Sequence, residues 1–458
     1  MKGSANTILA ITGIALVLGL AMSTSIFFMT KRVQAVPSYA RQTGLPCSSC
    51  HFTPPELTPL GRLFKLNGYT MTGIKLISAH GTSAKSGLSL LSFLPLSAQL
   101  QFSMTSTNAV QPGTQNGNVE LPQQASLFLA GALSTHVGSF IQVTYEGQSD
   151  HFSWDNTDVR YANHHNIFGK DTVLGLDFNN SPTVEDLWND TPAWGFPFVG
   201  SDVAPSPLAG TFIDGGLAQD VAGVGGYAMW DNHLYGAGFI YRSAHLGGLQ
   251  PNPGIGFGTN IQGVAPYWRV AWQQTYHDNY LEVGTYGMHL ASTPNAVTGP
   301  RDYLTDVAAD LQWERTLPWK QRNDVLTFHT TFIHENSDLL GSLAAGAAGF
   351  GPHVLNTFQA NAIYHIANKF APVFGVFGTT GTTDPTLYGV APVSGSATGN
   401  PLSKGYIFGL SYWPVQNIGL TAQYTGYTRF NGGNLNYDGS GRKASGNNGI
   451  YLMIWLLL

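Results

Sequence analysis

The chain of 458 residues is poor in charged side chains, in long apolar runs and in cysteine. Asp, Glu, Lys and Arg make up 10% of it, against about 25% in an ordinary soluble domain. Beyond one segment near the N-terminus there is no apolar run of about 20 residues, which excludes a bundle of transmembrane helices. The net charge of −5 argues against a nucleic-acid partner. Low charge combined with 55 glycines and 12% aromatic residues favours a protein that crosses the membrane with β-strands.

The two cysteines of the chain fall in one pentapeptide, Cys47-Ser48-Ser49-Cys50-His51. This C-x-x-C-H pattern is the signature of covalent c-type haem attachment. The two thiols bond to the haem, and His51 ligates the iron as the proximal ligand. A zinc site would need a second pair of ligands, and no further cysteine supplies one. We therefore expect one covalently bound haem c as the cofactor, and electron transfer as the first function to consider.

The N-terminal segment predicts export. An apolar run from Ile8 to Met29 is followed by the small-residue site Val33-Gln34-Ala35, which is typical of a signal peptide over residues 1–35. Attachment of c-type haem outside the cytoplasm agrees with export. Because the run is longer than a usual signal core and Lys31 and Arg32 follow it, an uncleaved membrane anchor remains an alternative.

Residues 36–87 are predicted to form a small cytochrome c module. About fifty residues cannot bury a sufficient core alone, and a covalently held haem would supply apolar surface. Thr58 is a candidate N-cap with Pro59 at the first helical position, which predicts a helix whose Leu60, Leu63 and Phe64 share one face. That face lies either against the porphyrin or against the rest of the protein.

The second axial ligand of the haem iron is left open by the sequence. Met71 follows the predicted helix and is the first candidate, since a thioether there would raise the reduction potential. His80 is the weaker candidate. If neither residue binds, the iron either keeps an open coordination site or takes a ligand from the second part of the chain.

Residues 88–458 predict an all-β fold, a transmembrane antiparallel β-barrel of roughly sixteen strands. In 268–276, Trp268, Val270 and Trp272 point one way, whereas Arg269 and Gln273 point the other. Short links alternate with long stretches rich in Gly, Asn, Pro and Ser, as expected of an outer-membrane barrel. With short turns in the periplasm, both ends of the barrel lie on that side. The haem module then either hangs below the barrel or sits in its lumen.

The amino-acid sequence around the haem motif resembles that of a known family. Residues 37–51, PSYARQTGLPCSSCH, followed by PELTPLGR at 55–62 and FKLNGYT at 64–70, are similar to the outer-membrane fused cytochrome-porins, the monohaem iron oxidases of iron-oxidising bacteria. The resemblance implies that extracellular ferrous iron donates electrons through a single haem c to a periplasmic cytochrome c or copper protein. Carried over to this chain, it assigns Cys47 and Cys50 to haem attachment and His51 to the proximal position.

Other charged residues have candidate roles, and two other functions stay open. Arg41, Arg62 and Lys65 either pair with the haem propionates or are solvated cations. Lumen-side Asp306, Asp310 and Glu314 are hard oxygen donors that can attract Fe²⁺. Two functions compete with iron oxidation: a solute-permeable porin with a haem plug or sensor, and an exporter of electrons to extracellular acceptors. In each case outer-membrane lipid surrounds the barrel.

Overall fold

The computed structural model describes residues 36–71, 76–79, 88–91, 93–112, 115–244, 260–294, 298–319 and 322–458. The predicted signal peptide and the candidate ligand His80 lie outside the described residues. Within those ranges, none of the helices has both the length and the apolar character needed to cross a membrane.

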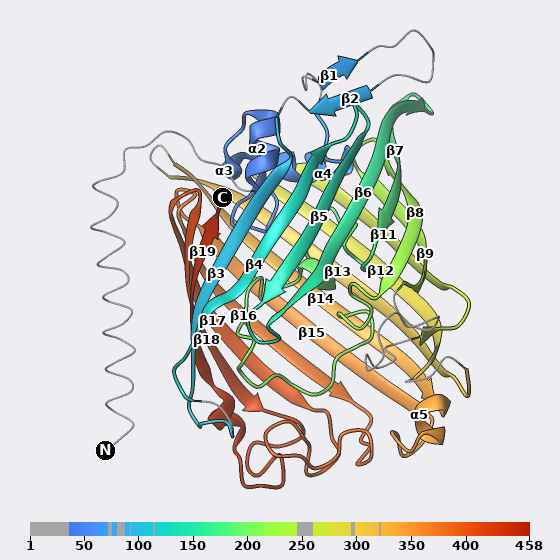
Figure 1. The fold of residues 1–458 in the computed structure, drawn as a ribbon, viewed down its shortest axis with the longest axis vertical. Coiled ribbons are helices and arrows are strands. Elements are labelled where there is room, and N and C mark those ends of the chain that lie inside the picture. The colour runs from blue at the N-terminus through green and yellow to red at the C-terminus, as the bar shows by residue number, and fades with distance from the viewer. Residues whose placement is uncertain are drawn as a thin grey trace.

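Within the described residues the helices are few and short, and strands make up more than half (Figure 1). The helices are α2 (Pro37–Thr43), α3 (Cys47–Cys50), α4 (Pro59–Leu66) and α5 (Leu340–Ala344), with 3-10 turns η1 (Pro192–Trp194) and η2 (Ala444–Asn447). The strands are β1 (Leu76–Ala79), β2 (Leu88–Leu91), β3 (Leu96–Thr107), β4 (Asn118–Ala132), β5 (Val137–Glu146), β6 (His151–Ile167), β7 (Lys170–Asn179), β8 (Val221–Trp230), β9 (Leu234–Ser243), β10 (Asn260–Ile261), β11 (Ala265–Tyr276), β12 (Asn279–Thr293), β13 (Asp302–Trp319), β14 (Arg322–Leu339), β15 (Pro352–His365), β16 (Phe370–Gly381), β17 (Ser403–Val415), β18 (Ile418–Arg429) and β19 (Gly449–Leu457).

The long strands form one closed antiparallel barrel. Each pairs with the next along the chain, β11 pairs with β9, and β19 pairs with β3 to close the ring. The two-residue strand β10 is an addition at the rim, so sixteen long strands make the wall. Among the residues that the structure describes, strands β1 and β2 pair only with each other. The predicted all-β barrel and its strand number are confirmed.

Short and long connections lie at opposite ends of the barrel (Figure 1). Links such as 231–233, 277–278 and 416–417 join strands at one end, where β3 begins and β19 ends. Most connections at the other end are long, including 382–402 and 430–448, although the 147–150 link there is short. The predicted alternation and the return of both barrel ends to one side are therefore confirmed. We call these the turn end and the loop end.

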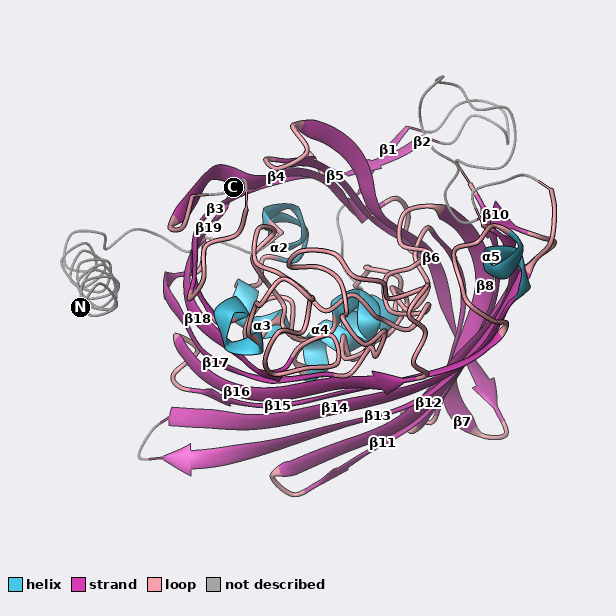
Figure 2. Ribbon diagram, turned by 90° about the horizontal axis from the view of Figure 1, so that it is seen from below, coloured by secondary structure: helices cyan, strands magenta, loops and turns pink. Residues whose placement is uncertain are grey.

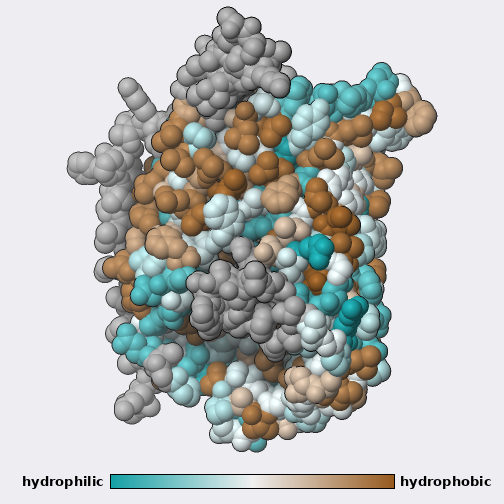
Figure 3. Space-filling model, turned by 45° about the vertical axis from the view of Figure 1, so that its right-hand side comes forward, coloured by the Kyte–Doolittle hydropathy of each residue, from teal (hydrophilic) through white to brown (hydrophobic). Residues whose placement is uncertain are grey.

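The outer face of the wall is apolar. Trp268, Val270 and Trp272 are 40–45% exposed, whereas Arg269 between them is fully buried in the lumen. Figure 3 shows brown, hydrophobic side chains gathered over one part of the surface, with teal, hydrophilic ones mainly beyond it. A closed barrel with an apolar outer face is characteristic of outer-membrane proteins.

The lumen is occupied by two segments, as the view along the barrel shows (Figure 2). The first is residues 36–71, which carry α2, α3 and α4 and which we call the N-terminal plug. The second is residues 180–220 between β7 and β8, which we call the lumen loop. The plug contacts opposite parts of the wall: Gln42 accepts a hydrogen bond from the Ala132 N–H at 2.8 Å, and Arg62 pairs with Glu314.

The predicted division into residues 1–35, 36–87 and 88–458 remains a prediction. The first strand of the closed sheet, β3, begins at Leu96. Strand β2 begins at the predicted boundary but belongs to the separate two-stranded sheet.

Candidate functional site

The C-x-x-C segment forms a single helical turn, α3, at the turn end of the lumen. The extended Pro46 precedes it, and the His51 N–H donates to the Cys47 carbonyl at 2.9 Å. The Cys47 N–H donates to Gln416 Oε1 at 2.7 Å. Because Gln416 lies in the link between β17 and β18, the barrel itself holds the start of the motif in place.

Helix α4 packs on this turn through Thr58. The Thr58 hydroxyl caps α4 by accepting from the Gly61 N–H at 3.2 Å and donates to the Ser49 carbonyl at 2.6 Å. The predicted N-cap is therefore confirmed. The prediction that the face of Leu60, Leu63 and Phe64 is buried is wrong in part. Leu63 is 45% exposed, whereas Phe64 and Leu66 are buried.

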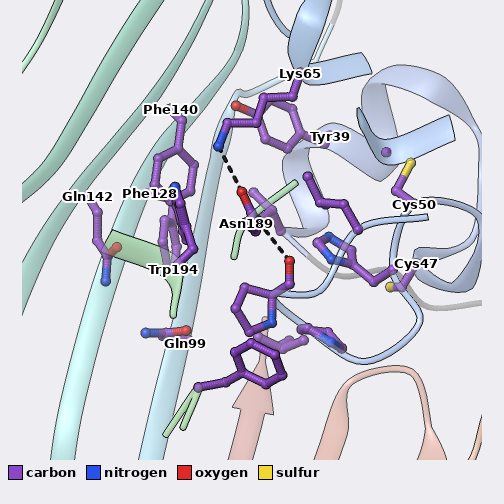
Figure 4. Close-up of a pocket in the computed structure, with 18 of the residues that line it drawn as sticks. Tyr39, Cys47, Cys50, Lys65, Gln99, Phe128, Phe140, Gln142, Asn189 and Trp194 are labelled. Atoms are coloured by element: carbon purple, nitrogen blue, oxygen red, sulfur yellow. Dashed lines mark hydrogen bonds between the residues drawn. The ribbon is translucent and has the colours of Figure 1, made fainter. Parts of the chain in front are cut away.

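Cys47, Cys50 and His51 line a cavity of about 470 Å³, a volume within the range of about 300–1,000 Å³ usual for ligand pockets. Figure 4 shows Cys47 and Cys50 on one side of this space and Phe128, Phe140 and Trp194 on the other. Other apolar lining residues are Val36, Tyr39, Leu45, Leu57, Phe64, Phe198, Trp455 and Leu457. Residues of the plug, the wall and the lumen loop all line the cavity.

Burial keeps the three motif side chains neutral. It raises the pKa of Cys47 to about 12 and the pKa of Cys50 to about 11. Burial also lowers the pKa of His51 to about 4, against the carbonyl groups of Glu56 and Pro55, which raise it. The imidazole is thus neutral near pH 7, and a neutral imidazole is the form that ligates a metal. Its Nδ1 is buried without a hydrogen-bond partner.

The residues present fit a covalently held haem. Two thiols outside any disulfide and a neutral imidazole stand on one wall of an aromatic cavity, which is the donor set that haem c requires. Among the lining residues that the structure describes, His51 is the one imidazole and no methionine is present. Met71 instead packs beside the cavity against the cluster of Phe64, Tyr69 and Phe128. The distal ligand therefore stays a prediction.

Of the three cations near the motif, only Lys65 lines the cavity. Its Nζ donates to Asn189 Oδ1 at 2.8 Å and lies 4.6 Å from the centre of the Trp194 ring. Burial, together with Arg160, lowers the pKa of Lys65 to about 7. Arg62 forms an ion pair with Glu314, and Arg41 donates a hydrogen bond to the Leu96 carbonyl.

The three lumen carboxylates predicted to attract Fe²⁺ are buried and in contact with other residues. Asp306 accepts from the Ile213 N–H at 2.7 Å, Asp310 accepts from Arg269, and Glu314 pairs with Arg62. They hold the plug, the lumen loop and the wall together.

A buried Glu56 fastens the other side of the plug. Its two carboxylate oxygens lie 3.0 Å from His365 Nε2 and 3.4 Å from His329 Nε2, on strands β15 and β14. Burial raises the pKa of Glu56, but His365 and His329 lower it more, so that the net value is about 2. Glu56 is therefore ionised in the folded protein throughout the mildly acidic range.

We predict that Glu56→Gln weakens the plug by about 3 kcal/mol at neutral pH. Because the folded pKa lies below the unfolded one, this stability is present above about pH 4.5 and is lost as the pH falls towards about 2. Thermal unfolding of both proteins across this pH range measures it, and the two curves should converge at the acid end. A difference that is independent of pH would contradict the role of the Glu56 charge.

Gly61 sets the distance between α4 and the C-x-x-C turn. A Cβ at this position would lie 2.2 Å from the Cys50 carbonyl oxygen, which is backbone and cannot swing away. We expect Gly61→Ala to separate the two helices and to cost about 1–3 kcal/mol, measured as faster hydrogen exchange of the α4 amides. Leu63→Ala, at the exposed position of the same helix, is the matched control. Equal exchange in both variants would count against this packing.

Comparisons with known proteins bear on the barrel alone. No protein-family profile and no curated protein matches the chain. Several solved structures, among them an outer membrane channel, are similar to it at low identity. DcaP of Acinetobacter baumannii has 11% identity and a TM-score of 0.44, covering 79% of this chain and 96% of that one. OmpF of Salmonella typhi has 12% and 0.43, covering 79% and 97%. OmpT of Vibrio cholerae has 11% and 0.41, covering 79% and 96%.

The strand pairing, rather than these likenesses, defines the class. A closed ring of sixteen long antiparallel strands, with an apolar exterior and long loops at one end, is the architecture of a porin-like outer-membrane barrel. This barrel differs from an empty channel in that a chain segment bearing a C-x-x-C-H motif lies inside it.

Sequence reasoning missed several residues of the site. Gln416 comes from a turn, whereas Asn189 and Trp194 come from the lumen loop. The sequence predicts 179–216, a stretch rich in Gly, Asn, Pro and Ser, as a long loop outside the barrel. A signal was present: Val184, Leu187 and Trp188 are large apolar residues in a stretch rich in Gly and Pro, and each is at most 1% exposed.

Proposed function

We propose that this protein is an outer-membrane c-type cytochrome that oxidises extracellular Fe(II) and passes the electrons to a periplasmic carrier. The observation that carries the proposal is the position of Cys47, Cys50 and His51 on one wall of an aromatic cavity inside the barrel. The resemblance of residues 37–70 to the monohaem cytochrome-porins supports ferrous iron as the electron donor.

The roles of the residues follow from their chemistry. Cys47 and Cys50 would hold the haem covalently, and the neutral His51 would be its proximal ligand. A bound haem c supplies a one-electron couple between ferric and ferrous iron. Lys65, at the cavity wall, would offer a positive charge to an acidic group there. The aromatic residues would limit the access of water to a haem bound there.

The occupied lumen supports the passage of electrons rather than solutes. A second cavity of about 370 Å³ is lined by residues near the loop end, among them Thr105 and Gly449, and by Phe196 and Pro197. Pro197 also lines the motif cavity. A donor entering from the loop end would thus come close to the motif cavity without crossing the plug.

Anaerobic mixing of the purified, haem-loaded protein with Fe²⁺ tests the proposal. We expect the absorption bands of reduced c-type haem to appear within the mixing experiment. Absence of reduction across pH 3–7, a range spanning roughly the pKa values of carboxylates and histidine, would overturn iron oxidation.

A second candidate is a solute-permeable porin in which the haem segment is a plug or sensor. The porin-like sixteen-strand wall favours it, because a barrel of this size encloses a channel when its lumen is clear. Fast sugar entry into liposomes without haem reduction by Fe²⁺ would select this function. Export of electrons to extracellular acceptors would use the same haem with electron transfer in the opposite direction. A haem reduction potential too low to accept electrons from Fe²⁺ would favour this function.

A further inference from the structure

A second cluster of chemically active groups lies where the lumen loop meets the wall. Arg269 on β11 is fully buried and is surrounded by four carboxylates. Its guanidinium is 2.7 Å from Asp310, 3.1 Å from Asp186, 3.3 Å from Glu282 and 3.6 Å from Asp190. Asp310 and Glu282 come from β13 and β12, whereas the other two come from the lumen loop.

The charges of this cluster do not balance. The other cation beside the cluster is Lys65, which donates to the backbone carbonyl of Asp186 and attracts its carboxylate, so we count Lys65 against Asp186. Arg269 is then left with three buried carboxylates, an excess of two negative charges. Uncompensated buried charge is strongly unfavourable, and such groups are usually paired, bound to a metal or neutralised by protons.

Several polar atoms in and beside the cluster are buried without a hydrogen-bond partner. Both carboxylate oxygens of Asp190 and the Oε2 of Glu282 are buried without a hydrogen-bond partner. The hydroxyl of Tyr286, a fully buried side chain in the field of Asp310 and Asp190, is also without one. Buried polar groups of a folded protein normally find partners, so this concentration of unsatisfied oxygens indicates a missing ligand.

The geometry suits a cation. One oxygen from each of Asp190, Glu282 and Asp310 lies within 4.8 Å of the others. Ligands on opposite sides of a Ca²⁺ ion, at about 2.3–2.6 Å each, are separated by about 5 Å. Glycine at position 284 lets two of these carboxylates lie close to the backbone of β12, because a Cβ at Gly284 would lie 2.7 Å from Asp310 Oδ1 and 2.7 Å from Glu282 Oε1.

We propose that Asp190, Glu282 and Asp310 form a buried site for one divalent cation that prefers oxygen ligands, with Arg269 as the fixed counter-charge. Carboxylate sites of this kind select Ca²⁺, Mg²⁺ or Mn²⁺ over metals that prefer sulfur or imidazole. Two positive charges neutralise the excess of two negative ones. The ion would cross-link the lumen loop and the wall, since Asp190 belongs to the loop and the other two ligands belong to the barrel. This site is independent of the haem and of iron oxidation.

Binding of Mn²⁺ to the full-length protein tests the site. The detergent-extracted, haem-loaded protein is stripped with a chelator, loaded with Mn²⁺ and passed through a desalting column, and the retained metal is counted by electron paramagnetic resonance. We expect one retained Mn²⁺ per chain, displaced by Ca²⁺. Failure of the folded wild-type protein to retain Mn²⁺ or Ca²⁺ would overturn the proposal and assign the charge balance to protons.

Three variants localise the bound ion. Asp190→Asn removes a ligand, and Gly284→Ala displaces two ligand carboxylates without altering a charge, so both should weaken Mn²⁺ binding at least about tenfold. Glu185→Gln is the matched control, since this buried loop carboxylate accepts from the Tyr267 hydroxyl at 2.6 Å and lies outside the three ligands. Heat-modified gel mobility identifies folded barrels. If one of the first two variants does not fold, the other decides, and wild-type affinity in it would overturn the site.

Discussion

Replacing both Cys47 and Cys50 with serine should abolish covalent haem attachment, the largest change we expect from any substitution. The two thiols line the same cavity wall, and the chain has no other cysteine to take their place. Haem staining after denaturing electrophoresis measures the effect, from one haem per chain to none. The barrel should survive, because its closure depends on the β19 to β3 pairing rather than on the motif.

The control for this experiment is Ser48→Ala, which changes the motif without removing a thiol. It should stain like the wild-type protein. Haem stain in the double serine variant, at wild-type intensity, would show that the cofactor is not held by thioether bonds. Absence of stain in the wild-type protein matured in a host that attaches c-type haem would remove the cytochrome function and leave the barrel intact.

Arg62→Met should release the N-terminal plug from the wall, with a loss of about 3–5 kcal/mol. The guanidinium pairs with Glu314, donates to the Leu57 carbonyl at 2.9 Å and covers the Tyr280 ring at 4.2 Å. Removing it leaves the Glu314 charge buried without its partner. Hydrogen exchange of the α4 amides should accelerate by about a hundredfold to several thousandfold, since each 1.4 kcal/mol is about tenfold.

The second substitution Glu314→Gln, made in the Arg62→Met protein, separates charge from shape. Because the orphaned carboxylate is then gone, part of the lost protection should return. A double variant that exchanges as fast as Arg62→Met would mean that packing against Tyr280, rather than the ion pair, holds the plug.

The sequence was informative wherever a pattern is local. The C-x-x-C-H motif, the Thr58 cap and the alternation around Arg269 each depend on residues close together in the chain, and links such as 231–233 mark the ends of strands. These features define the barrel, its strand number and the motif itself.

What could not be predicted depends on contacts between distant segments. Nothing near Asp190 in the chain indicates that it meets Glu282 and Asp310, because only the closed barrel brings the lumen loop to β12 and β13. The exposure of Leu63 has the same origin, since helical periodicity tells which residues share a face but not what that face meets. The scarcity of charge indicates a membrane location, but it does not reveal that many of the charged residues form buried pairs in the lumen.

The anchors of the N-terminal plug have a consequence for biogenesis. The plug is fastened to β4 through Gln42, to β13 through Arg62, to β15 through Glu56 and to the link before β18 through Cys47. Segments from both halves of the chain must therefore be in place before every anchor exists. Insertion of the barrel and docking of the plug therefore become one cooperative event. A chain that ends before its last three strands would lack Gln416 and so lose the hydrogen bond to the Cys47 N–H.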